Sequence, residues 1–247
     1  MKVLNLGCGS KISTHPDVCN IDWSPLLQLK SNRLFRMIAP LLLKDERLER
    51  FRALSDNIMV HNLKKRLPFQ DKSVDAVFFS HVLEHIDRQD APGFLAEIKR
   101  VLKPGGIVRI VVPDLEKICR DYLSHVSKSD SDPEEPRVHD FYVAAIIEQS
   151  VRREAFGSTQ QKPIRRFFEN ALLGDARNRG ETHQWMYDRI NLAELLRHVN
   201  FAAPRVLAYN ESRIQNWPHY GLEVDDHGEE YKPHSLYMEA EKLSEKS

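Results

Sequence analysis

Short apolar runs alternate with longer amphipathic stretches along this chain. The runs expected to form buried strands are Val3–Leu6, Asn20–Asp22, Ile58–Asn62, Val74–Phe79 and Ile107–Val112. A short helical turn is expected over Val82–Ile86. A full helix is expected over Ala91–Leu102 and should end at Pro104, because proline and the glycines after it cannot continue a helix. Strands that alternate with helical or looped crossovers are typical of a parallel sheet with covered faces.

The second half of the chain adds helices and a final pair of strands. Two helices are expected, each preceded by an aspartate suited to cap its first turn: Leu115–Val126 after Asp114, and Arg189–Val199 after Asp188. Two late runs, Arg205–Tyr209 and Ser235–Glu239, are expected to pair as antiparallel strands that close the sheet.

The region between the second and third strands, at about 24–56, is predicted to be a helical insert. Apolar residues recur at near-helical spacing over Leu26–Leu54, and Pro40 is expected to break this stretch into two helices. Arginines and lysines lie beside the apolar stripe. The insert could therefore be packing, a lid, or a surface that contacts a membrane or a partner, and we favour packing or a lid.

A second helical insert is expected at about 127–180. It begins with a polar loop over Ser127–Pro136, continues as helix over Val138–Leu173 and ends in a charged loop over Gly174–Gly180. It carries basic pairs at Arg152, Arg153, Arg165 and Arg166. We interpret residues 1–247 as a single domain with these two inserts.

The sequence after the first strand indicates a ligand site. Gly7 and Gly9 allow a sharp turn and a close approach of backbone to a ligand, at the strand end where open parallel sheets bind ligands. Asp22 follows 15 residues after Gly7 and could accept hydrogen bonds from ribose hydroxyls. A dinucleotide fingerprint would place a third glycine at Ile12 and an acid about 20 residues on. The pattern therefore favours a nucleoside without a pyrophosphate, and a dehydrogenase is a distant alternative.

With these parts in order, the chain resembles the class I S-adenosylmethionine (SAM)-dependent methyltransferases, and among them the type 11-like members. The segments that carry the resemblance are Leu4–Gly9, Asn20–Asp22, Leu67–His85 and Val101–Gly106. They cover about the first 112 residues. More narrowly, the chain resembles methyltransferases of bacterial surface-polysaccharide or glycan biosynthesis. The resemblance implies an α/β, Rossmann-like, doubly wound and mostly parallel seven-stranded sheet with an antiparallel last strand, and SAM as the cofactor.

The resemblance also assigns cofactor contacts to individual residues. Gly7 and Gly9 would allow close approach, Asp22 would bind the ribose hydroxyls and Trp23 would pack on the adenine. The other positions implied at the cofactor are Asn62 and Leu63 at the adenine edge, Ser80 and His81 at the sulfonium end, and Asn5 and Cys8 in the glycine motif. Asn5 stands where the family commonly has an acidic residue, and we interpret Cys8 as a small apolar side chain that fills space.

Methyl transfer from a sulfonium needs alignment above all, and a base helps when the acceptor is a hydroxyl. Histidine suits that role near neutral pH. The candidates are His81 and His85 after the fourth strand, and His183 in the Thr182–Asp188 run, where Tyr187 could assist by hydrogen bonding. Each has a structural alternative: His81 could shape the pocket, His85 could cap its turn, and Tyr187 could pack in the core.

Composition limits the remaining choices. The chain has 36 basic and 36 acidic side chains, which gives no support to a nucleic-acid partner. Its cysteines, Cys8, Cys19 and Cys119, and its histidines and carboxylates show no metal-ligand spacing, so we expect no metal. The chain begins on a strand and its apolar runs are short. We therefore expect a cytoplasmic protein with neither a signal peptide nor a transmembrane segment.

The sequence thus predicts a SAM-dependent methyltransferase that acts on an oxygen of a sugar, a glycan or a related small molecule. The arginine pairs of the second insert could hold a phosphate group of such an acceptor. The alternatives are a methyltransferase of a lipid, a protein or another metabolite, and a non-catalytic module that binds SAM or a partner. The acceptor atom and the oligomeric state stay open.

Overall fold

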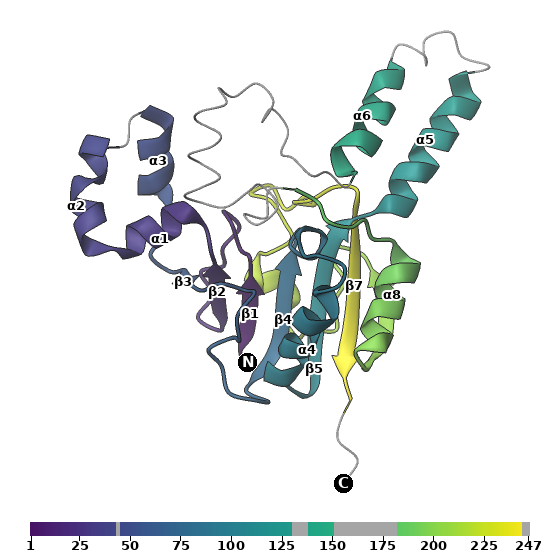
Figure 1. Ribbon diagram of the computed structural model, residues 1–247. Helices are drawn as coiled ribbons and strands as arrows, with labels where there is room; N and C mark the ends of the chain where they lie inside the picture. The colour runs from purple at the N-terminus through teal and green to yellow at the C-terminus, as the bar shows by residue number, and fades with distance from the viewer. Residues whose placement is uncertain (43–44, 130–137, 151–181, 244–247) are drawn as a thin grey trace.

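The computed structural model describes residues 1–42, 45–129, 138–150 and 182–243. A seven-stranded sheet in the order β3-β2-β1-β4-β5-β7-β6 runs through it (Figure 1). The strands are β1 Val3–Leu6, β2 Val18–Asp22, β3 Met59–Val60, β4 Val74–Ser80, β5 Leu102–Pro113, β6 Phe201–Leu207 and β7 Ser235–Lys242. Strands β1 to β5 pair in parallel, and β7 is antiparallel to both β5 and β6. The predicted fold class is confirmed.

The order of the strands creates a ligand-binding edge. β1 lies between β2 and β4, so the chain leaves β1 on one side and returns on the other. Ligands of open parallel sheets bind at the carboxyl ends of strands where the order reverses in this way. The ends of β1, β2 and β4 bring the glycine loop, Asp22 and Ser80 to the same edge of the sheet.

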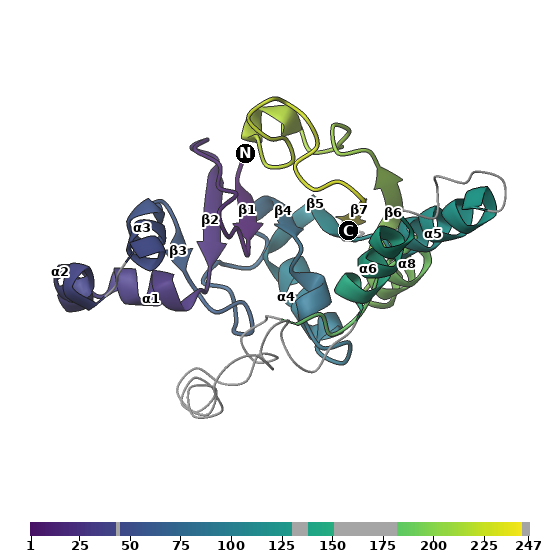
Figure 2. The same cartoon turned by 90° about the horizontal axis from the view of Figure 1, so that it is seen from above.

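Helices cover one face of the sheet. α4 (Ala91–Val101) and α8 (Arg189–His198) lie on this face (Figure 2). Leu95 of α4 and Leu192 of α8 are fully buried in one apolar cluster with Leu6 of β1. Asp188 caps α8 by accepting hydrogen bonds from the first turn, as predicted.

A segment without α-helix, residues 208–234, covers the opposite face (Figure 2). Residues 10–17, which connect β1 to β2, contain no helix, so this face lacks the helix that usually follows the first strand. The segment fills the gap with η4 (Trp217–Tyr220), whose Trp217 packs on Phe78 of β4 with ring centroids 5.1 Å apart. The crossover pattern along the sequence did not predict this cover.

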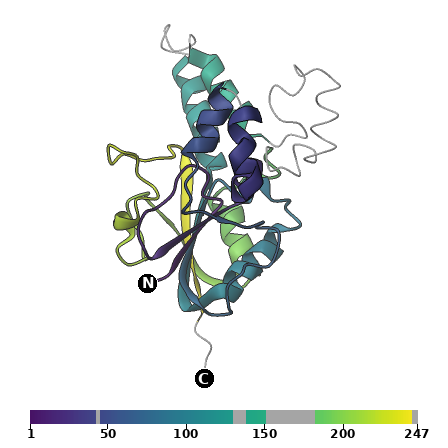
Figure 3. The ribbon, with the colours of Figure 1, turned by 90° about the vertical axis from the view of Figure 1, so that its left-hand side faces the viewer.

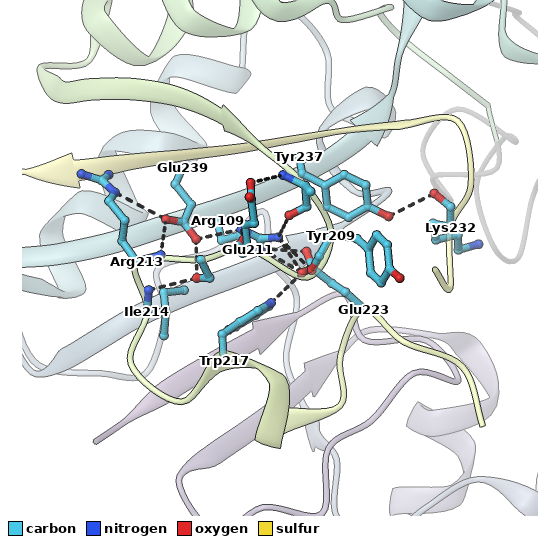
Figure 4. A network of polar contacts seen from close by, with 12 residues as sticks. Arg109, Tyr209, Glu211, Arg213, Ile214, Trp217, Glu223, Lys232, Tyr237 and Glu239 are labelled. Atoms are coloured by element: carbon cyan, nitrogen blue, oxygen red, sulfur yellow. Dashed lines mark hydrogen bonds and ion pairs between the residues drawn. The ribbon is translucent and has the colours of Figure 1, made fainter. Parts of the chain in front are cut away.

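A buried charge network fastens this segment to the sheet (Figure 4). The fully buried Arg109 of β5 donates hydrogen bonds to Glu223 at 2.7 to 2.9 Å and to Glu239 at 2.8 Å. Trp217 also donates to Glu223 at 2.6 Å. Buried charges are tolerated when paired in this way, and removing one partner is costly. The network therefore holds the segment in one position against the sheet.

The first insert forms three helices: α1 (Pro25–Ser31), α2 (Arg33–Leu42) and α3 (Asp45–Ala53). The break predicted at Pro40 is displaced: α2 continues through Pro40 to Leu42, and α3 begins at Asp45. The chain also turns at Asn32, whose backbone is extended and whose side chain accepts hydrogen bonds from the first turn of α2.

The outer face of α2 is apolar and uncovered within the described residues. Leu34, Met37 and Leu41 are 75 to 80% exposed. The lid, partner and membrane interpretations of this insert stay predictions. Among the described residues, none of the helices has the length and the apolar character needed to cross a membrane.

The second insert begins with α5 (Leu115–Ser129) and α6 (His139–Gln149), which stand side by side above the carboxyl edge of the sheet (Figure 3). Asp114 caps α5, as predicted. α5 continues to Ser129, so the loop predicted from Ser127 begins later than expected. The rest of the predicted helix to Leu173, the loop at 174–180 and the four arginines Arg152, Arg153, Arg165 and Arg166 lie outside the described residues.

Candidate active site

The glycine loop turns sharply at the end of β1. Gly7 and Gly9 have φ angles of +63° and +52°, a region that residues with side chains rarely adopt. A Cβ atom on Gly7 would lie 2.4 Å from Cγ2 of Val82, which is closer than real carbon atoms approach. Only glycine therefore fits at position 7, where the absence of a side chain leaves room for Val82.

Asp22 lies beside this loop at the end of β2. Its Oδ2 accepts a hydrogen bond from the backbone N–H of Gly9 at 2.7 Å. The bond holds the carboxylate at the edge of the sheet, and Oδ1 makes no hydrogen bond within the described chain. Trp23 follows with its indole 45% exposed. This arrangement offers an acceptor and an aromatic surface to one ligand.

Gly7 and Asp22 border a cavity of about 900 Å³, which we call the Asp22 cavity. Its volume is in the range of sites that hold a cofactor. The predicted cofactor residues that line it are Gly7, Asp22, Trp23, Asn62, Leu63 and His81. Charged side chains of the following loop and of the α4 region complete the wall: Lys64, Lys65, Arg66, Asp87, Asp90 and Glu97.

A second cavity, of about 140 Å³, also borders the glycine loop, and we call it the Lys232 cavity. Its walls include the predicted residues Asn5, Gly7, Cys8, Gly9, Ser80 and His81. The segment 208–234 adds Tyr231 and Lys232, and Lys11 completes the charged wall. The Lys11 ammonium lies 4.7 Å from the centre of the Tyr231 ring and donates to the Val224 carbonyl.

Sequence reasoning missed Lys11 and Lys232. Lys232 is far from the glycine loop along the chain, and nothing in its local pattern marks it as a ligand-binding residue. The Arg109 network and the packing of segment 208–234 bring it there. Cationic groups at this place suit the carboxylate of an amino-acid ligand.

Asn5 has a structural task that the sequence did not predict. It is 2% exposed, and its Nδ2 donates hydrogen bonds at 3.0 Å to the Lys11 carbonyl and to Oδ1 of Asn20. The amide thus braces the loop between β1 and β2. Burial, with the nearby Asp22 charge, raises the pKa of the Cys8 thiol to about 12, which fits the predicted role of an inert filler.

His81 lies where three cavities of the site meet. It follows β4 with a left-handed φ of +54°, and its Nε2 lies 3.0 Å from Oγ of Ser235. It borders the Asp22 cavity, the Lys232 cavity and a third cavity of about 520 Å³ beside α5 and α6, which we call the His125 cavity. Burial, with nearby Lys232, lowers the His81 pKa to about 4, so the ring is neutral at pH 7.

Glu84 lies beneath His81 in η1 (Leu83–His85) and is 1% exposed. Its Oε1 is 3.3 Å from Nδ1 of His81, but neither carboxylate oxygen has a hydrogen-bond partner within the described chain. Burial raises the Glu84 pKa to about 8. The charged form of a buried carboxyl group without hydrogen-bond donors is costly, and this cost is the cause of the raised pKa.

The run from Thr182 brings His183 to the same place. The backbone N–H of Gln184 donates to the Glu84 carbonyl at 2.6 Å, which docks this run on η1. The His85 and His183 rings then meet edge to face with centroids 4.8 Å apart. The structure therefore gathers all three candidate histidines around Glu84, although the sequence shows only His81 and His85 near each other.

Tyr187, also predicted as a helper, lies in the core. It is 3% exposed, and its hydroxyl has no hydrogen-bond partner among the described residues. The predicted hydrogen bond to His183 is therefore not formed. Burial, with nearby Glu84, raises the pKa of the Tyr187 phenol above its usual value.

The residues at this edge fit SAM. Its nucleoside fits the Asp22 cavity, where Asp22 could accept hydrogen bonds from a ribose and Trp23 could pack on an adenine. Gly7 borders this cavity, and its missing side chain lets Val82 pack against the loop. Lys11 and Lys232 suit the carboxylate of its methionine part.

Comparison with known proteins supports this interpretation. Residues 28–110 match the family described as a methyltransferase domain. A ubiquinone/menaquinone biosynthesis C-methyltransferase of Desulfotalea psychrophila is 51% identical over 41 residues, which are 17% of this chain and 16% of that protein. An uncharacterized methyltransferase of Schizosaccharomyces pombe is 30% identical over 126 residues, 48% of this chain and 42% of that protein. The chain thus spans less than half the length of either relative.

Among solved structures, one similar chain is a putative methyltransferase of Haloferax volcanii in complex with the Trm112 methyltransferase activator. It is 16% identical, with 98% of this chain and 83% of that chain covered and a TM-score of 0.43. The matching family domain and the two relatives support a methyltransferase, in agreement with the expectation from the sequence.

Proposed function

We propose that this protein transfers a methyl group from SAM to a hydroxyl oxygen of a sugar, a glycan or a related small molecule. The observation that carries the proposal is the position of Asp22, whose carboxylate the Gly9 N–H holds at the mouth of the Asp22 cavity beside Gly7. This is where a nucleoside would lie across the ends of the first two strands.

The chain's own residues would position the cofactor. Asp22 would accept hydrogen bonds from the ribose hydroxyls, and Trp23 would pack on the adenine. Lys232 would pair with the carboxylate, with Lys11 beside it. Bound SAM supplies a methyl group on a positive sulfur: the acceptor oxygen bonds to the methyl carbon, the carbon–sulfur bond breaks, and its electron pair stays on sulfur. The protein's part is to align the acceptor oxygen with that bond.

The acceptor would enter from the His125 cavity. This cavity meets the two cofactor-side cavities at His81, so a group held there can reach the sulfonium end of the cofactor. We assign His81 to receive the acceptor's proton by way of the Ser235 hydroxyl, whose Oγ lies 3.0 Å from Nε2: Ser235 passes its own proton to Nε2 and takes the proton of the acceptor. The polar side chains that line the His125 cavity favour an acceptor rich in hydroxyl groups: Lys117, Asp121, Ser124, His125, Lys128 and His234.

Ligand binding tests the cofactor half of the proposal. Titration calorimetry of the full chain should show binding of SAM and S-adenosylhomocysteine and none of NAD. Binding of NAD alone would contradict it.

Product detection tests the acceptor half. S-adenosylhomocysteine release should be measured with sugar nucleotides, glycan fragments, lipid acceptors and peptides. Release with the sugar acceptors alone supports the proposal. Release with lipid or peptide alone would assign another acceptor class, and binding without release for any acceptor would indicate a non-catalytic module.

A further inference from the structure

We propose that Glu84, His85 and His183 form a binding site for a divalent transition-metal ion at the edge of the Asp22 cavity. Each of the three residues offers one potential ligand atom, and these three atoms all lie within 4.8 Å of one another. His85 lines the Asp22 cavity, so an ion held here would border the space where the proposed reaction takes place.

Glu84 supplies the first argument. Its side chain is 1% exposed, and both carboxylate oxygens lack a hydrogen-bond partner within the described chain. Buried oxygens of this kind are nearly always satisfied by a donor or by a cation. His85 follows Glu84 in η1, and the docking of residues 182–187 adds His183, but neither imidazole gives the carboxylate a hydrogen bond.

The orientation of the two imidazole rings supplies an independent argument. Nδ1 of His85 lies 3.2 Å from the Thr182 carbonyl, and Nδ1 of His183 lies 3.0 Å from the Gln149 carbonyl. A carbonyl only accepts, so Nδ1 must carry the proton in both rings. Nε2 of each ring is therefore the nitrogen with a lone pair. Metal-binding histidines are typically fixed in this way, with one ring nitrogen bonded to a carbonyl or carboxylate and the other on the metal.

The donor set indicates which metal the site would select. Mg²⁺ and Ca²⁺ prefer oxygen ligands, whereas imidazole suits zinc, iron, nickel and copper. Two histidines and one glutamate are also the protein ligands of some catalytic zinc sites, which keep a further position open. We therefore take Zn²⁺ as the reference ion, and Co²⁺ as its spectroscopic substitute.

A role for this ion in catalysis would rest on the proposed function, while the binding of the ion does not. An open coordination position beside His81 would orient an acceptor hydroxyl and weaken its O–H bond. His183 would then act as a metal ligand, which differs from the role of a base expected from the sequence.

Direct metal binding tests the proposal. The full chain, freed of metal by chelation, should bind one equivalent of Zn²⁺ by calorimetry and should not bind Mg²⁺. Co²⁺ should develop the visible absorption of a histidine-carboxylate site. Glu84→Gln and His183→Ala should each weaken Zn²⁺ binding by at least about tenfold, as loss of a ligand or its support does. His198→Ala, an exposed histidine at the end of α8, is the matched control and should bind Zn²⁺ like the wild type.

Two further measurements, the melting temperature and the SAM affinity, complete the test. Zn²⁺ should raise the melting temperature of the wild type and of His198→Ala but not of Glu84→Gln, because only a bound ligand stabilises the folded state. Zn²⁺ binding that is absent in the wild type, or equal in all variants, would overturn the metal site. SAM affinity, measured in the same samples, separates the two proposals: SAM binding without Zn²⁺ binding removes only the metal site, and the reverse removes only the proposed function.

Discussion

Asp22 and Gly9 are joined by a hydrogen bond of 2.7 Å from the glycine N–H to Oδ2 of the carboxylate. The bond links the end of β2 to the turn after β1, so one side chain both shapes the glycine loop and faces the Asp22 cavity. The residue that we assign to the ribose is therefore held in place before any ligand binds, which lowers the ordering cost of binding.

Two substitutions of Asp22 can separate its contact with the glycine loop from its proposed contact with the ribose. Asp22→Ala removes the loop contact and the ligand contact together and should weaken SAM binding by more than tenfold, about 1.4 kcal/mol. Asp22→Asn can still accept from Gly9, so the loop should stay ordered while affinity falls by a smaller factor. Calorimetry measures both. Glu194→Ala, a change at an exposed acid of α8 that does not line this cavity, is the control and should bind normally. Unchanged affinity in Asp22→Ala would contradict the ribose assignment.

Gly7 should tolerate no side chain. Gly7→Ala places a Cβ 2.4 Å from Val82 and keeps an unfavourable φ of +63°, so SAM affinity should fall by about tenfold or more. The double variant Gly7→Ala with Val82→Ala removes the collision but not the backbone strain. It should recover part of the affinity. Recovery to the wild-type value would show that the φ angle has no effect.

Lys232 should act on the amino-acid part of the cofactor alone. Lys232→Ala should weaken S-adenosylhomocysteine binding several-fold and leave adenosine binding unchanged, because adenosine has no carboxylate. Calorimetry with both ligands checks this. Lys117→Ala, a cation paired with Asp121 on α5, serves as the control for net charge. Equal losses for the two ligands would argue that Lys232 supports the fold of the site instead.

Arg109 should be among the most sensitive positions for folding. Arg109→Met leaves Glu223 and Glu239 buried without their cation, and the free energy of unfolding should fall by about 3–5 kcal/mol. Urea denaturation monitored by tryptophan fluorescence measures it, with Trp217 as a reporter inside the network.

A surface ion pair provides the comparison for Arg109. Arg197→Ala breaks the exposed pair with Glu194 and should cost at most about 1 kcal/mol. A similar loss in both variants would show that burial does not set the contribution of Arg109.

The cysteines should differ in reactivity. Cys119 is exposed, whereas burial raises the Cys8 pKa to about 12, so very little Cys8 thiolate exists at pH 8. Alkylation with iodoacetamide at pH 8, followed by mass spectrometry, should modify Cys119 rapidly and spare Cys8 until the protein is denatured. Rapid labelling of Cys8 in the folded protein would mean that the glycine loop opens.

Local sequence determined much of the architecture. The strands β1, β4 and β5, the helices α4 and α8 with its Asp188 cap, and the antiparallel closing pair follow from apolar periodicity and capping chemistry, which depend on neighbours along the chain. The glycine loop and Asp22 were recognisable for the same reason, since their spacing is short. The break predicted at Pro40 is displaced because proline only disfavours a helix, and the turn made by the side chain of Asn32 was not predicted.

Tertiary structure decided the rest. The sheet face without a helix is covered by segment 208–234, because the buried Arg109 pairs with Glu223 across the fold. That packing brings Lys232 to the glycine loop, and the docking of Gln184 on Glu84 brings His183 to His85. These contacts join residues about a hundred or more positions apart, and they depend on burial and charge pairing that no local pattern records.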